Sequence, residues 1–141
     1  MVVDIHAELD ESSVPDVRQY EESIVSRSRD ILSDVEQTAR DRVNELVRPL
    51  GYQVKLLHLE RNESIVLYVA CFTSSVVVSL RDQWKTGQLK DNIQSLFNFI
   101  AGDNTPTALI KRLTWSDSDY TRCMAFFEAR GKNSRIFFVL F

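Results

Sequence analysis

Residues 55–100 read KLLHLERNESIVLYVACFTSSVVVSLRDQWKTGQLKDNIQSLFNFI, and the pattern of apolar residues changes once within this stretch. Two β-rich runs, residues 52–60 and 64–72, flank the polar link Arg61-Asn62-Glu63-Ser64. This arrangement is typical of a β-hairpin. The second run is apolar on both faces, so we expect it to lie inside a sheet, with the more polar first run nearer an edge.

Helical spacing follows the hairpin. Apolar residues recur every three or four positions from Leu80 to Ile100, and Gly87 interrupts them. This spacing predicts two consecutive helices, or one helix with a kink at Gly87. The run Val76-Val77-Val78 either extends the second strand or begins the first of these helices.

Upstream, residues 2–9 alternate between apolar and polar side chains, which fits either a half-buried strand or a loose N-terminus. Residues 16–50 carry a narrow apolar stripe with a period near 3.6, which predicts a long, highly charged amphipathic helix. An unbroken helix of that length would measure about 50 Å. We therefore expect a break near residues 30–33 or a projecting end, with Pro49 and Gly51 ending the helix.

Downstream, residues 107–115 form a predicted strand with Leu109, Leu113 and Trp115 on one face. Ser116 is an N-cap candidate for a short helix, with Asp119 at the third helical position. A turn at residues 131–134 and a last strand at 135–141 complete the prediction. An unpaired last strand would be prone to self-association.

The predicted order is (β)αββαβαβ, and the predicted fold class is α+β. It contains the β-α-β-β-α-β order of the ferredoxin-like motif, an antiparallel sheet packed by helices on one face. We expect residues 1–141 to form one domain. Residues 1–15 would be a strand or a loose terminus, 16–50 the long helix, and 51–141 the sheet-and-helix core.

Composition narrows the classes of function. The chain has a net charge of −3 and 44% hydrophobic residues, which is ordinary for a globular protein and argues against nucleic acid as a partner. A polybasic membrane-binding patch is disfavoured for the same reason. Without a signal peptide or an apolar run long enough to span a bilayer, we expect a cytoplasmic protein. Cys71 and Cys123 are then expected to be buried, reduced thiols.

The residues offer little catalytic chemistry. His6 and His58 have no cysteine or aspartate at metal-ligand spacing, which argues against a zinc site. The sequence shows neither a nucleophile elbow nor a glycine-rich phosphate loop. Asp117 and Asp119 form a carboxylate pair in sequence, but helix capping accounts for both. We expect a protein that is not an enzyme and that uses no cofactor or metal.

RNA binding is an alternative because RRM domains stack bases on the aromatic residues of a ferredoxin-like sheet. Tyr68 and Phe72 fall on one face of the second hairpin strand. That strand lacks the basic-glycine-aromatic signature, and the net charge is negative. We therefore interpret these two aromatic residues as core residues.

The hairpin and the segment after it resemble the N-terminal domain of the TRADD family of death-receptor adaptors. The resemblance lies in Leu57-x-x-x-Arg61 before the turn, the apolar strand ending in Cys71-Phe72, and Leu80-Arg-x-x-Trp84-x-x-Gly87-x-Leu89 followed by Gln94-x-Leu96. It covers roughly residues 56–127.

The resemblance implies an α+β sandwich that binds TRAF-type adaptors through one face of its sheet. The positions that match family contact residues are Glu60, Asn62 and Val66, with Thr114 matched less closely. Several features depart from the family: Glu60 stands where the family has histidine, the hairpin link is one residue shorter, and the preceding helix is longer and more charged. No death domain follows within residues 1–141.

The expected function is therefore a protein–protein interaction domain in cytosolic immune or apoptotic signalling. Two alternatives stay open at this point. One is a self-associating module that uses the long helix or the C-terminal strand, and the other is an RRM-like RNA-binding domain.

Overall fold

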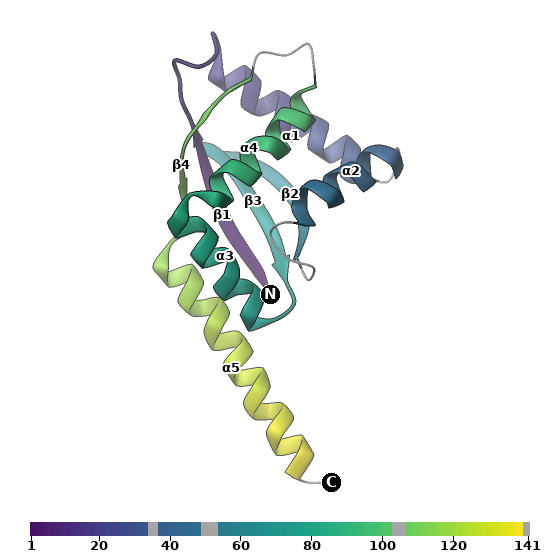
Figure 1. The fold of residues 1–141 in the computed structure, drawn as a ribbon, viewed down its shortest axis with the longest axis vertical. Helices are drawn as coiled ribbons and strands as arrows, with labels where there is room; N and C mark the ends of the chain where they lie inside the picture. The colour runs from purple at the N-terminus through teal and green to yellow at the C-terminus, as the bar shows by residue number, and fades with distance from the viewer. Residues whose placement is uncertain (34–36, 49–53, 103–106, 140–141) are drawn as a thin grey trace.

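The computed structural model describes residues 1–33, 37–48, 54–102 and 107–139. These residues form four strands and five helices (Figure 1). In chain order they are β1 (Val2–Leu9), α1 (Val17–Leu32), α2 (Gln37–Val47), β2 (Val54–Asn62), β3 (Ser64–Cys71), α3 (Ser74–Thr86), α4 (Gln88–Ala101), β4 (Ile110–Thr114) and α5 (Asp117–Val139). The predicted α+β class is confirmed, since all five helices pack against a single sheet.

The sheet is antiparallel throughout, and its strands lie in the order β2-β3-β1-β4. Residues 2–9, for which sequence left a strand or a loose terminus open, form the central strand β1. Its alternate residues Val3, Ile5, Ala7 and Leu9 are buried, and the residues between them are partly exposed. β3 lies inside the sheet and β2 at its edge, as predicted from their apolar content.

The hairpin turn is tighter than the four-residue link implied. Asn62 pairs directly with Ser64, and Glu63 between them has a φ of 62°, in the left-handed region. β2 also contains a bulge between Leu56 and His58, so that Leu57 is an extra residue opposite β3. The predicted strand start at residues 52 and 53 lies outside the described residues.

The predicted helix breaks are confirmed. The long N-terminal helix ends at Leu32, and α2 begins at Gln37. Pro49 and Gly51, the expected helix terminators, lie outside the described residues. Gly87 separates α3 from α4 with a φ of 87°, and no atom lies within 4 Å of where a Cβ would sit. Glycine is therefore favoured there by its backbone conformation rather than by space.

The start of α3 settles the position of Val76, Val77 and Val78. The Thr73 side chain accepts a hydrogen bond from the Val76 amide at 3.3 Å, so that Thr73 caps the helix. The three valines are helical, and Val77 is fully buried.

β4 is shorter than predicted, and Leu109 is not on its core face. Both backbone polar groups of Leu109 are bonded to the loop after β1: its amide donates to Ser13 Oγ (3.0 Å) and its carbonyl accepts from Asp10 N (2.8 Å). The register of β1 and β4 shifts at Leu9, which pairs with Ile110. Ile110 therefore takes the buried position, and Leu109 is exposed.

Gln94 of α4 holds the beginning of β4 with its side-chain amide. Its Nε2 donates to the Ala108 carbonyl (2.9 Å), and its Oε1 accepts from the Ile110 amide (2.8 Å). The amide thus bonds two backbone groups of the edge strand in the way that a neighbouring strand would.

The prediction of a turn at 131–134 and a strand at 135–141 is wrong for the described residues, because α5 continues to Val139. Residues 140 and 141 lie outside the described part. In Figure 1, α5 runs away from the sheet, and its C-terminal half projects beyond the other elements. A strand there would have no neighbouring backbone to bond, whereas a continued helix satisfies its own N–H and C=O groups.

Candidate functional site

The four residues singled out from the sequence all belong to one face of the sheet. We call this the outer face; it carries the β1 residues Val2, Asp4, His6 and Glu8 and the residues paired with them. Glu60 of β2 pairs with Val66 of β3, Val66 pairs with His6 of β1, and His6 pairs with Thr114 of β4. Three predicted residues therefore lie in one row across all four strands, and Asn62 lies two positions from Glu60 along β2.

The accessibility of these residues differs. Glu60, Asn62 and Thr114 are exposed, but Val66 is only 2% exposed because neighbouring side chains cover it. Val66 can therefore support the shape of the row but offers almost no surface to a partner.

Aromatic residues beside this row are more exposed than sequence predicted. Tyr68, interpreted above as a core residue, lies on the outer face and is partly exposed, and Phe72 is 60% exposed. The Tyr68 ring stacks on His58, with ring centroids 4.4 Å apart. The prediction that Tyr68 is a core residue is wrong because its side chain lies on the outer face. Its cross-strand neighbours there are Asp4 of β1 and His58 of β2, rather than residues of a helix.

Glu60 ties this pair of rings to the row. Its Oε2 accepts a hydrogen bond from the Tyr68 hydroxyl (3.1 Å), and its Oε1 lies 3.4 Å from His58 Nε2. The hydrogen bond to the carboxylate raises the pKa of Tyr68. The three side chains therefore form an ordered polar and aromatic cluster at the β2 side of the outer face.

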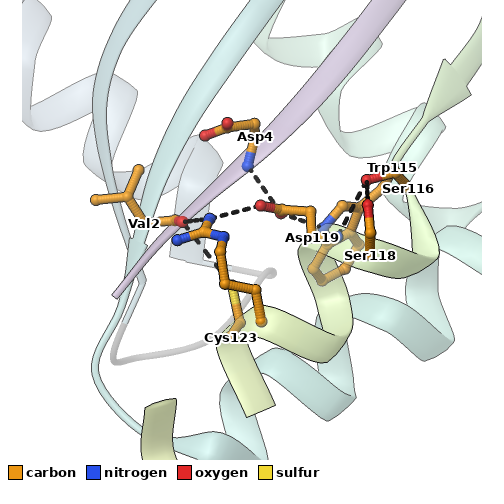
Figure 2. A network of polar contacts seen from close by, with 8 residues as sticks. Val2, Asp4, Trp115, Ser116, Ser118, Asp119 and Cys123 are labelled. Atoms are coloured by element: carbon orange, nitrogen blue, oxygen red, sulfur yellow. Dashed lines mark hydrogen bonds and ion pairs between the residues drawn. The ribbon is translucent and has the colours of Figure 1, made fainter. Parts of the chain in front are cut away.

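At the opposite side of the sheet, the first turns of α5 lie beside the beginning of β1, which β4 does not reach (Figure 2). β4 pairs with β1 only from His6 onward, so the beginning of β1 lacks a strand neighbour on this side. The Asp119 carboxylate accepts from the Asp4 amide (3.3 Å) and from Trp115 Nε1 (2.8 Å). Arg122 donates to the Val2 carbonyl (3.1 Å) and pairs with Asp119 (2.5 Å). Side chains of α5 thus satisfy the free edge of β1.

The capping role expected for Ser116 is confirmed, since its Oγ accepts from the Asp119 amide at 3.1 Å. Asp119 does more than cap, because its carboxylate reaches across to β1. A sequence pattern could not reveal this contact, which joins residues 115 positions apart.

A hollow of about 690 Å³ lies between the outer face and the first turns of α5. Its lining includes His6, Thr114, Ser116 and the acidic residues Asp4, Glu8 and Glu63. Partial burial, and secondarily the nearby Asp119 carboxylate, raise the pKa of Asp4. The lining residues are thus charged or polar, with acidic side chains more numerous than the single arginine, Arg122, and the Asp4 carboxyl is held at an energetic cost when ionised.

The surface residues described above are mainly charged or hydrogen-bonding side chains. Among the residues that the structure describes, no three His, Cys, Asp or Glu side chains are grouped so that they could hold a metal ion. Cys71 and Cys123 are buried as expected, and desolvation raises their pKa values to about 12 and about 11, so neither is an activated nucleophile.

Sequence reasoning missed Asp4, Tyr68 and Asp119 as members of this surface. The alternation of residues 2–9 predicts that Asp4 and His6 lie on one side of a strand, but only the position of β1 beside β3 brings them next to Tyr68 and Val66. Within the described residues, no helix is both long and apolar enough to cross a membrane. Comparison with family models, with curated proteins and with solved structures finds no significant match to this chain.

Proposed function

We propose that this chain is a non-enzymatic protein–protein interaction domain whose partner binds the outer face of the sheet. The observation that carries the proposal is the grouping of Glu60, Asn62 and Thr114 as exposed residues on this one face. The resemblance that predicts these three positions rests on sequence patterns and does not depend on the strand order. Two residues of a hairpin strand and one residue of a distant strand need not lie on the same face of a sheet.

The fold interpretation that goes with this proposal is a ferredoxin-like core with α5 appended. The element order β1-α-β2-β3-α-β4 and the sheet order β2-β3-β1-β4 support it. In this interpretation the helices cover one face, which leaves the other for a partner. The residues fit such a role, since Glu60 and His58 keep more than half of their side chains exposed.

The resemblance to the TRADD N-terminal domain supplies the class of partner. We infer a TRAF-type adaptor as that partner, and cytosolic immune or apoptotic signalling as the setting. The hydrogen-bonded cluster of Glu60, Tyr68 and His58 supports a preorganised contact surface, because ordered side chains lose less conformational entropy on binding.

Titration calorimetry of the full chain with a purified trimeric TRAF-type domain tests this proposal. The triple variant Glu60→Ala/Asn62→Ala/Thr114→Ala should bind more weakly, by roughly tenfold or more, if these side chains contain a hot spot. Val66 is left intact because truncating a buried residue would destabilise the sheet.

The matched control is Arg18→Ala/Gln19→Ala/Glu22→Ala, which truncates three exposed residues of α1. It should bind like the wild type. Equal loss in both triple variants, or no binding by the wild type, would overturn the assignment of this face to a TRAF-type partner.

One observation favours RNA as a second candidate, namely the exposed aromatic pair Tyr68 and His58 on a sheet face. The acidic residues Asp4, Glu8 and Glu60 on the same face oppose it, because they would repel phosphates. Fluorescence anisotropy with single-stranded RNA at low salt decides between the two. Binding that is lost in Tyr68→Ala would favour RNA.

A further inference from the structure

The outer edge of β2 is open to another strand. β2 is nine residues long and lies at the end of the sheet. Among the described residues, no backbone hydrogen bond from another segment reaches β2 on the side away from β3. Such an edge presents unpaired N–H and C=O groups that a further strand can bond.

A hollow of about 360 Å³ runs along this edge. It is lined by Ser28 and Leu32 of α1 on the core side, and by His58 and Glu60 on the outer-face side. Only a space beside the edge strand touches residues from both sides of the sheet. Leu57, which is 38% exposed, also lines it. The edge therefore has room for the side chains of an added strand.

The bulge gives β2 a symmetry that a regular strand of this sequence would lack. Lys55 and Glu60 lie on the outer face, opposite Ala70 and Val66 of β3, while Leu56 and Leu59 are buried. In a regular strand, residues 55 and 60 would point to opposite faces. Because Leu57 is an extra residue, the pattern of exposed and buried side chains from residue 55 to 60 reads the same in both directions.

We propose that two copies of this chain pair through β2, antiparallel, about a two-fold axis between Leu57 and His58. In this register Lys55 of one copy faces Glu60 of the second, and Leu56 faces Leu59 of the second. Every pair then joins side chains on the same face, as a continuous sheet requires. A closed two-fold pairing also removes both open edges at once.

Charge complementarity favours a second copy over an unrelated strand. The two-fold axis generates two Lys55–Glu60 pairs, each with opposite charges directly across the new strand boundary, where such pairs are stabilising. Lys55 is exposed and lies at one end of this segment, while Glu60 lies at the other. An unrelated peptide would satisfy the backbone equally well but would match this spacing of charges only by chance.

This dimer is independent of the proposed function, although Glu60 borders both surfaces. The new contact lies at the edge of the sheet, whereas the proposed partner surface extends over its face to Thr114. It also differs from self-association through the long helix or the C-terminal segment.

Sedimentation velocity of the full chain over a wide concentration range tests the proposal. The wild type should dimerise reversibly. The two-fold axis repeats the contact between residues 55 and 60, so Lys55→Glu and Glu60→Lys each create two pairs of like charges at the dimer contact. Each variant should raise the dimer dissociation constant roughly tenfold. The double variant Lys55→Glu/Glu60→Lys restores opposite charges and should regain the wild-type constant. Leu57→Lys, which puts two like charges beside the axis, should weaken the dimer independently.

Lys85→Glu is the control, because it makes the same charge change at an exposed position of α3 far from β2 in the fold. It should leave the dissociation constant unchanged. Every variant should keep the wild-type far-UV circular dichroism spectrum and unfold cooperatively in urea, which shows that a weakened dimer is not the result of misfolding. A wild type that stays monomeric at every concentration overturns the proposal. So does a dimer that the single variants do not weaken, or that they weaken and the double variant fails to restore.

Discussion

Arg81 is one of two charged residues that are buried in the described part of the chain, together with Glu21. It is 5% exposed, and its guanidinium carbon lies 4.3 Å from the ring centroid of Trp84, 5.3 Å from that of Trp115 and 5.1 Å from that of Tyr120. It donates to the Trp115 carbonyl at 2.6 Å and pairs with the Asp117 carboxylate. One side chain of α3 thus joins the end of β4 to the beginning of α5.

Replacing Arg81 by alanine should destabilise the fold by about 2–4 kcal/mol, because three ring contacts are lost and the Trp115 carbonyl is left unpaired. Lysine should recover only part of this, since it lacks the planar fork that reaches two acceptors. The measurement is the free energy of unfolding from urea titration.

Asp117, the partner of Arg81 in the ion pair, should contribute much less to stability than Arg81 does. Its side chain is 95% exposed, so Asp117→Asn should cost less than about 1 kcal/mol. A loss in Asp117→Asn equal to that in Arg81→Ala would mean that the ion pair, and not the ring contacts, holds Arg81. The sequence places Arg81 beside Trp84 on one helix but does not reveal its other two aromatic neighbours, because Trp115 follows β4 and Tyr120 belongs to α5.

At the scale of elements, local patterns identified most of the structure. The hairpin, the break after α1 and the junction at Gly87 each depend on residues that are adjacent in sequence. The C-terminal segment was misread because residues 135–141 are β-prone, while the backbone partner that a strand requires is a property of the whole sheet. The face of Leu109 was misread for a similar reason, since loop residues Asp10 and Ser13 set its register.

The docking of α5 on β1 should depend on Asp119. In Asp119→Ala, the Asp4 amide and the Trp115 indole both lose their acceptor, so we expect a loss of about 1–3 kcal/mol. Amide hydrogen exchange at Asp4 should accelerate more than exchange at Leu67 in β3. Asp119→Asn keeps one acceptor oxygen and should fall between the wild type and the alanine variant.

Ser118→Ala is the control for this prediction, because Ser118 is exposed on the same turn and its hydroxyl contacts only Ser116, at 3.3 Å. Its stability and its exchange pattern should match the wild type. Unchanged exchange at Asp4 in Asp119→Ala would show that the docking of α5 on β1 does not depend on the Asp119 carboxylate, and that Arg122 and the apolar contacts suffice.

At the scale of the whole molecule, the sequence predicted the fold class but not the neighbours of each strand. The outer face exists because β1 lies between β3 and β4, which brings His6 beside Val66 and Thr114. These pairings join residues that are 60 and 108 positions apart, since 66 − 6 = 60 and 114 − 6 = 108. Amphipathic patterns report which side of a strand is buried, and they carry no information about which strand lies next to it.

Glu21 links the helical layer to the hairpin and makes global stability depend on pH. It is 5% exposed on α1, and its Oε1 lies 3.6 Å from Arg61 Nε of β2. Burial raises its pKa from the ordinary 4.5, and the Arg61 charge offsets only part of that effect. The folded protein therefore binds a proton at Glu21 more readily than the unfolded chain does.

The sign of the pH dependence follows from this difference in proton binding. Because the native state takes up the proton first, the Glu21 contribution stabilises the fold as pH falls from neutral through the folded pKa, and it levels off below the unfolded pKa. Asp4, whose pKa is also raised, acts in the same direction.

We expect the free energy of unfolding of Glu21→Gln to depend less on pH than that of the wild type between neutral pH and about pH 5. Urea unfolding at several pH values measures this dependence. Glu22→Gln, which neutralises the exposed neighbouring carboxylate, should reduce the slope only slightly, because the Glu22 charge is the smallest of the effects on the pKa of Glu21. If Glu21→Gln kept the wild-type slope, the pKa of Glu21 would be the same in the folded and unfolded states, and the Arg61 contact would then balance its burial.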